Sequence, residues 1–89
     1  MKPSELTKDL YLKKVKDVLI EVYKYSSEEA DDMMRRFSKD VDEGYRSLTS
    51  EEKFVSIHPN DSESLRLFRN GNYIESGISD MAWGLDLMA

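Results

Sequence analysis

The sequence predicts an all-α protein, a compact bundle of four or five short helices in a single domain that spans residues 1–89. Three observations lead to this fold class. Apolar residues recur at intervals of three and four over long segments, which places them on one face of a helix. Helix-capping residues stand at the start of several of these segments. A chain of 89 residues without cysteine also has the length for only one small core, which no disulfide or thiolate-bound metal stabilises.

The first helix is expected to begin near Ser4 or Thr7, both of which can cap a helix, and to end at about Lys24. Its apolar residues form two adjacent rows along the helix. One row is Leu12, Val15, Leu19 and Val22, and the other is Tyr11, Val15, Val18 and Val22. An apolar face of this width indicates a helix that packs against two neighbours.

The second helix is expected to begin within the segment "YSSEEADDMMRRF", residues 25–37. Ser26 and Glu29 have the spacing of a capping box, and Tyr25 and Ala30 have the spacing of a hydrophobic staple. Gly44 is expected to end this helix. Its acids and arginines pair four residues apart, which is typical of a helix surface rather than of a metal or nucleic-acid site. The buried stripe is expected to consist of Ala30, Met33, Met34, Phe37 and Val41.

The sequence does not decide whether residues 53–76 form helices or a hairpin. Thr49 and Glu52 form another capping-box pattern, which favours a short helix that ends before Pro59, although "KFVSI" also has the composition of a strand. Further on, Leu65 and Phe68 favour a helix that stops at Asn70-Gly71. The alternative is a type I′ hairpin around Asn70-Gly71, which would make the fold α+β.

A terminal helix is expected to begin at Ser79, with Gly77 ending the element before it. Ile78 and Trp83 have the spacing of a hydrophobic staple around this start. Met81, Leu85 and Met88 then form an apolar stripe, with Trp83 beside it. This pattern indicates that the terminal helix docks on the first two helices.

No pattern in the sequence indicates a catalytic residue, a bound cofactor or a metal. His58 is the only histidine, and it lies in an expected turn with no cysteine or paired carboxylates beside it. Phosphate-binding loops, nucleophile elbows and H-E-x-x-H motifs are absent. "DVDEG" from Asp40 has some features of a calcium loop, including Glu51 at the twelfth position. The pattern fails because position five is Gly44, which has no side-chain oxygen, and position six is Tyr45 instead of glycine.

The net charge of −5 is distributed unevenly along the chain. Residues 1–25 carry six lysines and four acids, whereas residues 26–89 carry seven basic and fourteen acidic residues. Lys13, Lys14 and Lys16 could contact phosphates, but Asp9, Asp17 and Glu21 interrupt this cluster, which disfavours a nucleic-acid partner. No segment approaches the roughly 20 apolar residues that span a bilayer, and no signal-peptide pattern is present. We therefore expect a cytoplasmic protein without a membrane partner.

Two segments together resemble a known family: "VKDVLIEVYKYSSEEADDM", Val15 to Met33, and "GISDMAWGLDLM", Gly77 to Met88. They are similar to small transposon-encoded proteins of conjugative elements in clostridial-type bacteria. In that family a lysine-bearing helix leads into a helix start of tyrosine, serine, acids and alanine. The resemblance implies a cytoplasmic accessory protein of a mobile genetic element with no established activity, and it assigns no functional residues.

These observations favour a non-enzymatic accessory protein that acts through protein–protein interaction. Its partner is expected to be another protein, and no small-molecule substrate is indicated. The apolar side chains expected to be shared between the core and a partner interface are Met34, Met81, Trp83 and Met88, and methionine adapts to varied surfaces. The alternative function is a small nucleic-acid-binding regulator that uses the lysine-rich first helix.

Overall fold

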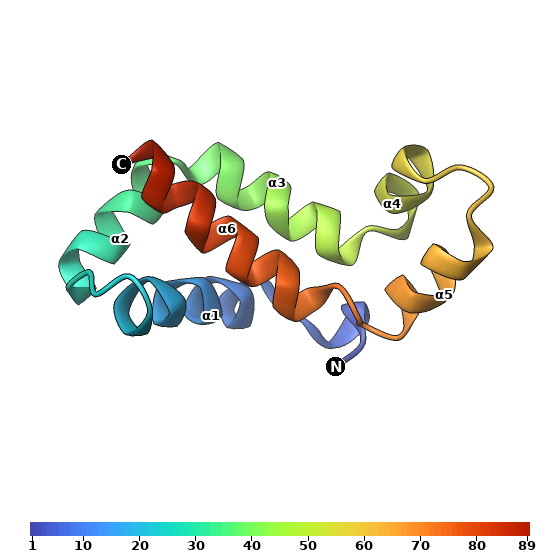
Figure 1. Ribbon diagram of the computed structural model, residues 1–89, viewed down its shortest axis with the longest axis horizontal. Helices are drawn as coiled ribbons and strands as arrows, with labels where there is room; N and C mark the ends of the chain where they lie inside the picture. Colours follow the sequence, from blue (N-terminus) through green and yellow to red (C-terminus); the bar gives the residue numbers. More distant parts are fainter.

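The computed structural model describes residues 1–89, and every regular element in it is a helix (Figure 1). A 3₁₀ helix and six α-helices follow one another: η1 (Pro3–Glu5), α1 (Lys8–Glu21), α2 (Ser27–Arg36), α3 (Ser38–Thr49), α4 (Glu51–Ile57), α5 (Ser62–Arg69) and α6 (Ile74–Met88). The all-α fold class is therefore confirmed. Both β alternatives, the strand at "KFVSI" and the hairpin around Asn70-Gly71, are wrong.

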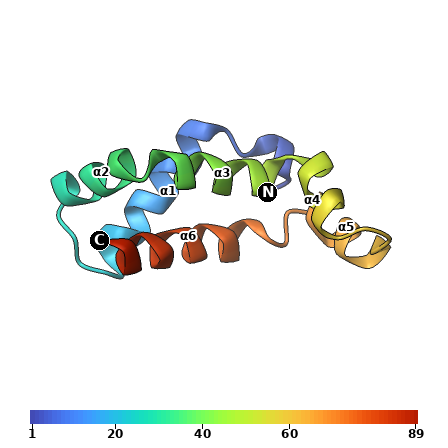
Figure 2. The ribbon, with the colours of Figure 1, turned by 90° about the horizontal axis from the view of Figure 1, so that it is seen from above.

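Four of the helices, α1, α2, α3 and α6, form a bundle, and the α4–α5 pair projects from one end of it (Figure 1). This projection gives the molecule dimensions of 41 × 21 × 18 Å. Seen from above, α6 runs along one side of the bundle and α2 and α3 run along the other (Figure 2). Helix α6 packs mainly on α1 and also on α3. None of the helices is long and apolar enough to cross a membrane.

A single core of twelve buried side chains joins the four bundle helices and the segment before α1. Two tyrosines in and beside this core donate hydrogen bonds to backbone carbonyls. Tyr11 donates to the Val41 carbonyl at 3.1 Å, and Tyr45 donates to the Leu6 carbonyl at 2.7 Å. Burial raises the pKa of Tyr11 to about 12, so its hydroxyl remains a donor. The core residues are Leu6, Tyr11, Val15, Leu19, Ala30, Met33, Val41, Leu48, Ile74, Ile78, Ala82 and Leu85.

The predicted helix starts are confirmed where the cap is local in sequence. The Thr7 hydroxyl accepts a hydrogen bond from the Leu10 amide at 3.1 Å and begins α1. Ser26 and Glu29 form both bonds of the capping box, at 3.1 and 3.0 Å. For α4 the cap is Ser50, one residue later than predicted, because the Thr49 hydroxyl instead donates to the carbonyl of Tyr45 within α3.

The helix ends predicted at two glycines are wrong. The second helix is interrupted at Phe37, whose φ and ψ are −108° and 35°, and α3 then continues through Gly44 to Thr49. Likewise, α6 begins at Ile74 rather than at Ser79 and continues through Gly77. The interruption at Phe37 divides one predicted helix into two, which is why six α-helices replace the expected four or five.

Both misread glycines lie where helices α3 and α6 approach closely. A Cβ on Gly44 would collide with Met81 Cε and stand 2.6 Å from the Tyr11 hydroxyl. A Cβ on Gly77 would overlap the Leu48 side chain, with Cδ1 at 3.0 Å. Glycine is present at these positions because the neighbouring helix occupies the space of a side chain.

Candidate functional site

The four side chains predicted to form a partner interface do not lie on one surface. Met34 and Met81 are half-buried and pack against the core. Met34 lies on α2, and Met81 lies on α6 where it faces Gly44 of α3. Trp83, which is 56% exposed, and Met88 are both exposed on α6, but they stand five residues apart and so point about 140° away from each other around the helix. The structure therefore does not gather the predicted set on one face: Met88 lies on the side of Met81, seven residues before it, and Trp83 lies on another side.

The exposed side of α6 carries a group of large apolar side chains. We name this surface the α6 outer face and define it as Asp80, Trp83 and Leu87. Leu87 follows Trp83 by four residues, so the two lie on the same side of the helix, and Leu87 is 63% exposed. Sequence reasoning missed Leu87. A helix start at Ile74 would have found it, because Ile74 and Ile78 set the buried side and leave Trp83 and Leu87 opposite.

The α6 outer face contains one acid, Asp80, and the helix around it carries two more. Residues 70–89 contain Glu75, Asp80 and Asp86 and no lysine or arginine. Lys14 of α1 comes within 3.8 Å of Glu75, but neither Asp80 nor Asp86 belongs to any of the ten ion pairs. Asp86 accepts a hydrogen bond from the Tyr25 hydroxyl at 2.6 Å, and this bond raises the pKa of Tyr25. A partner with basic groups would complement this face.

A groove of about 620 Å³ lies between α1 on one side and α2 and α3 on the other. We name it the α1–α3 groove. Its apolar residues are Leu12, Met34 and Val41, and none of its residues belongs to α6. The polar residues that line it are Lys8, Lys13, Lys16, Asp31, Arg35, Ser38 and Asp42. Four basic residues and two acids make the lining positive in a chain whose net charge is −5.

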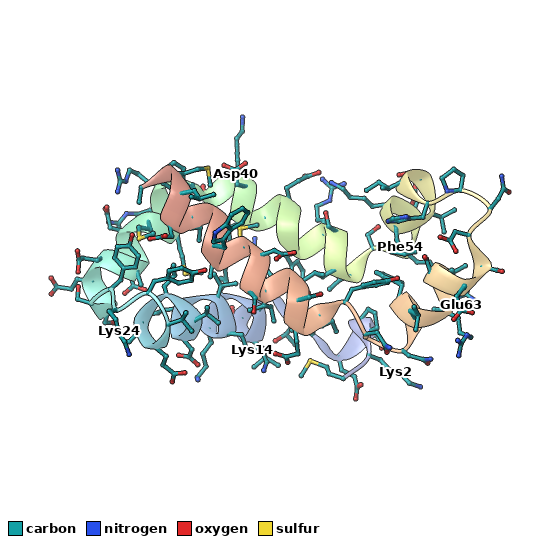
Figure 3. All side chains as sticks on the ribbon, viewed as in Figure 1. Lys2, Lys14, Lys24, Asp40, Phe54 and Glu63 are labelled. Atoms are coloured by element: carbon teal, nitrogen blue, oxygen red, sulfur yellow. The ribbon has the colours of Figure 1, made fainter.

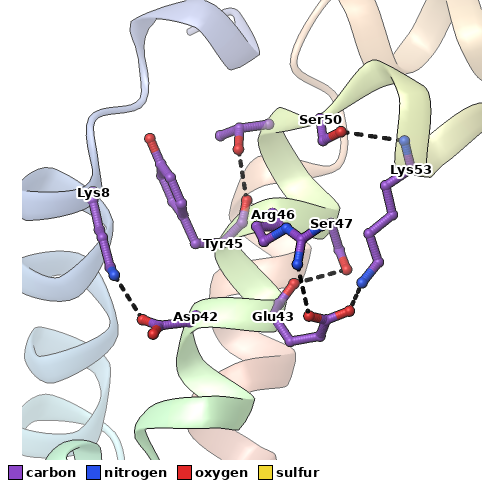
Figure 4. A network of polar contacts seen from close by, with 9 residues as sticks. Lys8, Asp42, Glu43, Tyr45, Arg46, Ser47, Ser50 and Lys53 are labelled. Atoms are coloured by element: carbon purple, nitrogen blue, oxygen red, sulfur yellow. Dashed lines mark hydrogen bonds and ion pairs between the residues drawn. The ribbon is translucent and has the colours of Figure 1, made fainter.

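Two ion pairs join the walls of the groove. Lys8 Nζ lies 2.8 Å from the Asp42 carboxylate of α3 (Figure 4), and Lys16 Nζ lies 3.0 Å from Asp31 of α2. The two lysines are eight residues apart, about 12 Å along a helix at 1.5 Å per residue. Leu12 lies midway between them in sequence. The apolar part of the groove is therefore short and is bounded by an ion pair at each end.

The other two basic residues of the groove pair with acids outside its lining. Lys13 bonds Asp17 at 2.9 Å, which raises the pKa of Lys13, and Arg35 bonds Asp32 at 3.0 Å. These contacts are exposed to solvent, so they stabilise the fold little, and either cation can turn toward a ligand. Lys13 and Arg35 belong to opposite walls of the groove.

The lysines predicted to form the alternative nucleic-acid surface do not all lie together, because Lys13 and Lys16 line the α1–α3 groove and Lys14 does not. Lys13, Lys14 and Lys16 each lie within 4 Å of a carboxylate, on Asp17 of α1, Glu75 of α6 and Asp31 of α2 respectively. The three lysines therefore contact three different helices. A phosphate-binding surface needs a concentrated basic face, whereas only two of these three lysines lie together and each of the three is paired with an acid, so this arrangement disfavours it.

The remaining candidates from the sequence lie in structural positions. His58 packs on Phe54, with ring centroids 4.5 Å apart, in the α4–α5 pair, where Phe54 lies on the side of α4 that faces α5 (Figure 3). Asp40 and Gly44 belong to α3, so "DVDEG" is helical rather than a loop. No three histidine, aspartate or glutamate side chains converge in a way that could hold a metal ion.

Comparisons with known proteins give no further information about the function. A scan against models of protein families finds no match, and searches of curated proteins and of solved structures find none either. The α6 outer face and the α1–α3 groove are therefore the features from which function can be argued.

Proposed function

We propose that this protein is a non-enzymatic accessory factor that binds another protein through the α6 outer face. The observation that carries the proposal is the exposure of Trp83 and Leu87 on one side of a single helix. Tryptophan is enriched among the residues that dominate binding energy at interfaces, and grouped exposed apolar side chains commonly mark such sites. The chain has only one tryptophan, and more than half of it is in solvent.

The acidic character of the same face narrows the class of partner. Asp80 and Asp86 stand three residues before and after Trp83, so the tryptophan is flanked by carboxylates along the helix. A partner surface that combines an apolar pocket with lysine or arginine at its edge would complement this arrangement. The proposed activity involves no catalytic residue, cofactor or small-molecule substrate.

We further propose that the protein acts in the cytoplasm as part of a mobile genetic element. This part of the proposal rests on the resemblance of residues 15–33 and 77–88 to transposon-encoded proteins. Sequencing of the flanking DNA would test it. Neighbouring relaxase or integrase genes would support the assignment, and an operon of housekeeping genes would contradict it.

A role as a nucleic-acid-binding regulator is the alternative, and the pairing of the α1 lysines with carboxylates argues against it. We expect no binding to duplex DNA tighter than roughly 10⁻⁵ M near physiological salt, which is within the range of ordinary non-specific affinity. A fluorescence anisotropy titration at two salt concentrations would measure this. Saturable binding near 10⁻⁸ M, typical of specific complexes, would replace the protein-partner proposal.

Capture of partners from extracts of the source bacterium tests the proposed function. Tagged wild-type protein is compared with Trp83→Ala and with Ile57→Ala, whose isoleucine on α4 is 59% exposed and so provides a matched control. We expect Trp83→Ala to lose a partner that wild type and Ile57→Ala both retain. Equal recovery of every partner by all three proteins would contradict the assignment of the α6 outer face.

A further inference from the structure

We propose that a partner of the α6 outer face is a second copy of this chain, whose α1–α3 groove receives Trp83. The inference rests on the proposed function, because it takes the α6 outer face to be a protein-binding surface. In this interaction, the α6 outer face of one copy binds the α1–α3 groove of another.

The groove has the size and the chemistry to receive Trp83. Its volume of about 620 Å³ falls within the range of roughly 300–1,000 Å³ typical of ligand pockets. Leu12 and Met34 would contact the indole, and methionine sulfur interacts favourably with aromatic rings. Leu87, one helical turn after Trp83, would cover the apolar edge of the groove.

The acids on either side of Trp83 complement the basic residues on the walls of the groove. Asp80 and Asp86 precede and follow Trp83 by three residues, while Lys13 and Arg35 stand on opposite walls of the groove. An indole between Leu12 and Met34 would thus bring a carboxylate toward each cation. The alternative, in which two α6 outer faces pair symmetrically, would place acids against acids because residues 70–89 carry no basic side chain.

The positions of the two surfaces determine the type of assembly. Helix α6 lies on one side of the bundle, and α2 and α3 lie on the other (Figure 2). One copy can therefore offer its α6 outer face to one neighbour and its groove to a different neighbour. Such a heterologous contact adds subunits head to tail, so the average mass should rise continuously with concentration. An interface built around one tryptophan is small, so we expect a dissociation constant of roughly 10⁻⁴ M for each contact.

Sedimentation velocity of the full chain, from about 10 μM to about 1 mM, tests the association itself. The average mass of the wild type should increase with concentration. The emission of Trp83, the only tryptophan, should shift to shorter wavelength over the same range. A wild type that stays monomeric to about 1 mM overturns the inference. If Trp83→Ala still loses a captured partner, the proposed function stands without it.

Two complementary variants test the head-to-tail geometry. Trp83→Ala removes the inserted side chain but keeps the groove, and Met34→Glu blocks the groove but keeps Trp83. Each variant alone should remain monomeric, whereas an equimolar mixture should form a one-to-one dimer that cannot grow. Because Trp83→Ala contains no tryptophan, the emission of the mixture comes only from Trp83 of the other variant, and its shift reports insertion directly.

A second groove variant guards against misfolding of Met34→Glu, since Met34 is half-buried. Lys13→Glu combined with Arg35→Glu reverses charge at two exposed positions and should give the same result in the mixture. If the groove variants still self-associate while Trp83→Ala does not, two α6 outer faces pair symmetrically and the inference fails. Undiminished self-association of Trp83→Ala overturns it as well.

Discussion

The inner and outer faces of α6 have opposite surroundings although they belong to one helix. On the inner face, Ile78, Ala82 and Leu85 are at most 2% exposed and complete the core against α1 and α3. On the outer face, Trp83 and Leu87 are more than half exposed and no other helix covers them. Burial of the inner face stabilises the bundle, whereas the outer face leaves apolar area available for a partner.

Two glycines of α6, which are seven residues and so about two turns apart on the same side of the helix, also differ in their surroundings. At Gly77, the Leu48 side chain already occupies the position of a Cβ. At Gly84, no atom lies within 4 Å of that position. Gly77 is required by packing against α3, while Gly84 lies farther along α6, where no neighbour fills the space. Substitutions of the two glycines should therefore have opposite effects on stability.

The largest expected effect comes from comparing two leucines two positions apart. Leu85→Ala should lower the free energy of unfolding by about 2–5 kcal/mol, because it removes a fully buried side chain and leaves a cavity. Leu87→Ala should change it by no more than about 0.5 kcal/mol, since Leu87 is exposed. Urea denaturation followed by circular dichroism measures both. Similar values for the two variants would mean that the register of α6 is wrong.

The next effect in size is overpacking at the inner face. Gly77→Ala should destabilise the protein by about 1–3 kcal/mol, because the added methyl group must displace Leu48. The double variant Gly77→Ala with Leu48→Ala should be destabilised by less than the sum of the two single variants, because the smaller side chain at position 48 makes space for the added methyl group. Thermal melts of the three variants would show this coupling. Strict additivity would contradict the close approach of α3 and α6.

A smaller effect of opposite sign is expected at Gly84. Gly84→Ala should stabilise the protein by roughly 0.5–1 kcal/mol, because alanine favours the helical backbone and its Cβ meets nothing. Urea denaturation under the conditions used for Gly77→Ala measures the gain. Destabilisation at Gly84 would show that another part of the molecule covers this side of α6.

The fold was predictable from sequence where the signal is local. Ser26 and Glu29 cap α2 through atoms three residues apart, so the pattern specifies the contact. Gly44 and Gly77 were misread as helix ends because the reason for glycine there lies on other helices, at Met81, Tyr11 and Leu48. No property of the neighbouring sequence distinguishes a packing glycine from a terminating one.

The candidate site was predictable only in part for the same reason. Trp83 and Met88 were identified as interface residues by side-chain type, and both are exposed on α6. Leu87 was missed because the misplaced helix start at Ser79 obscured which side of α6 is buried. The α1–α3 groove brings together residues 8–16 and 31–42, and its formation depends on how α1 packs beside α2 and α3. Spacing within either segment carries no information about that packing.

The most direct test of the claim that the α6 outer face serves binding rather than folding is to measure both properties of one variant. For Trp83→Ala, we predict a change in the free energy of unfolding of less than about 1 kcal/mol, because most of the side chain is already in solvent. The same purified protein should lose the partner captured by the wild type. A loss of stability greater than about 2 kcal/mol, or undiminished capture by a stably folded variant, would contradict the account.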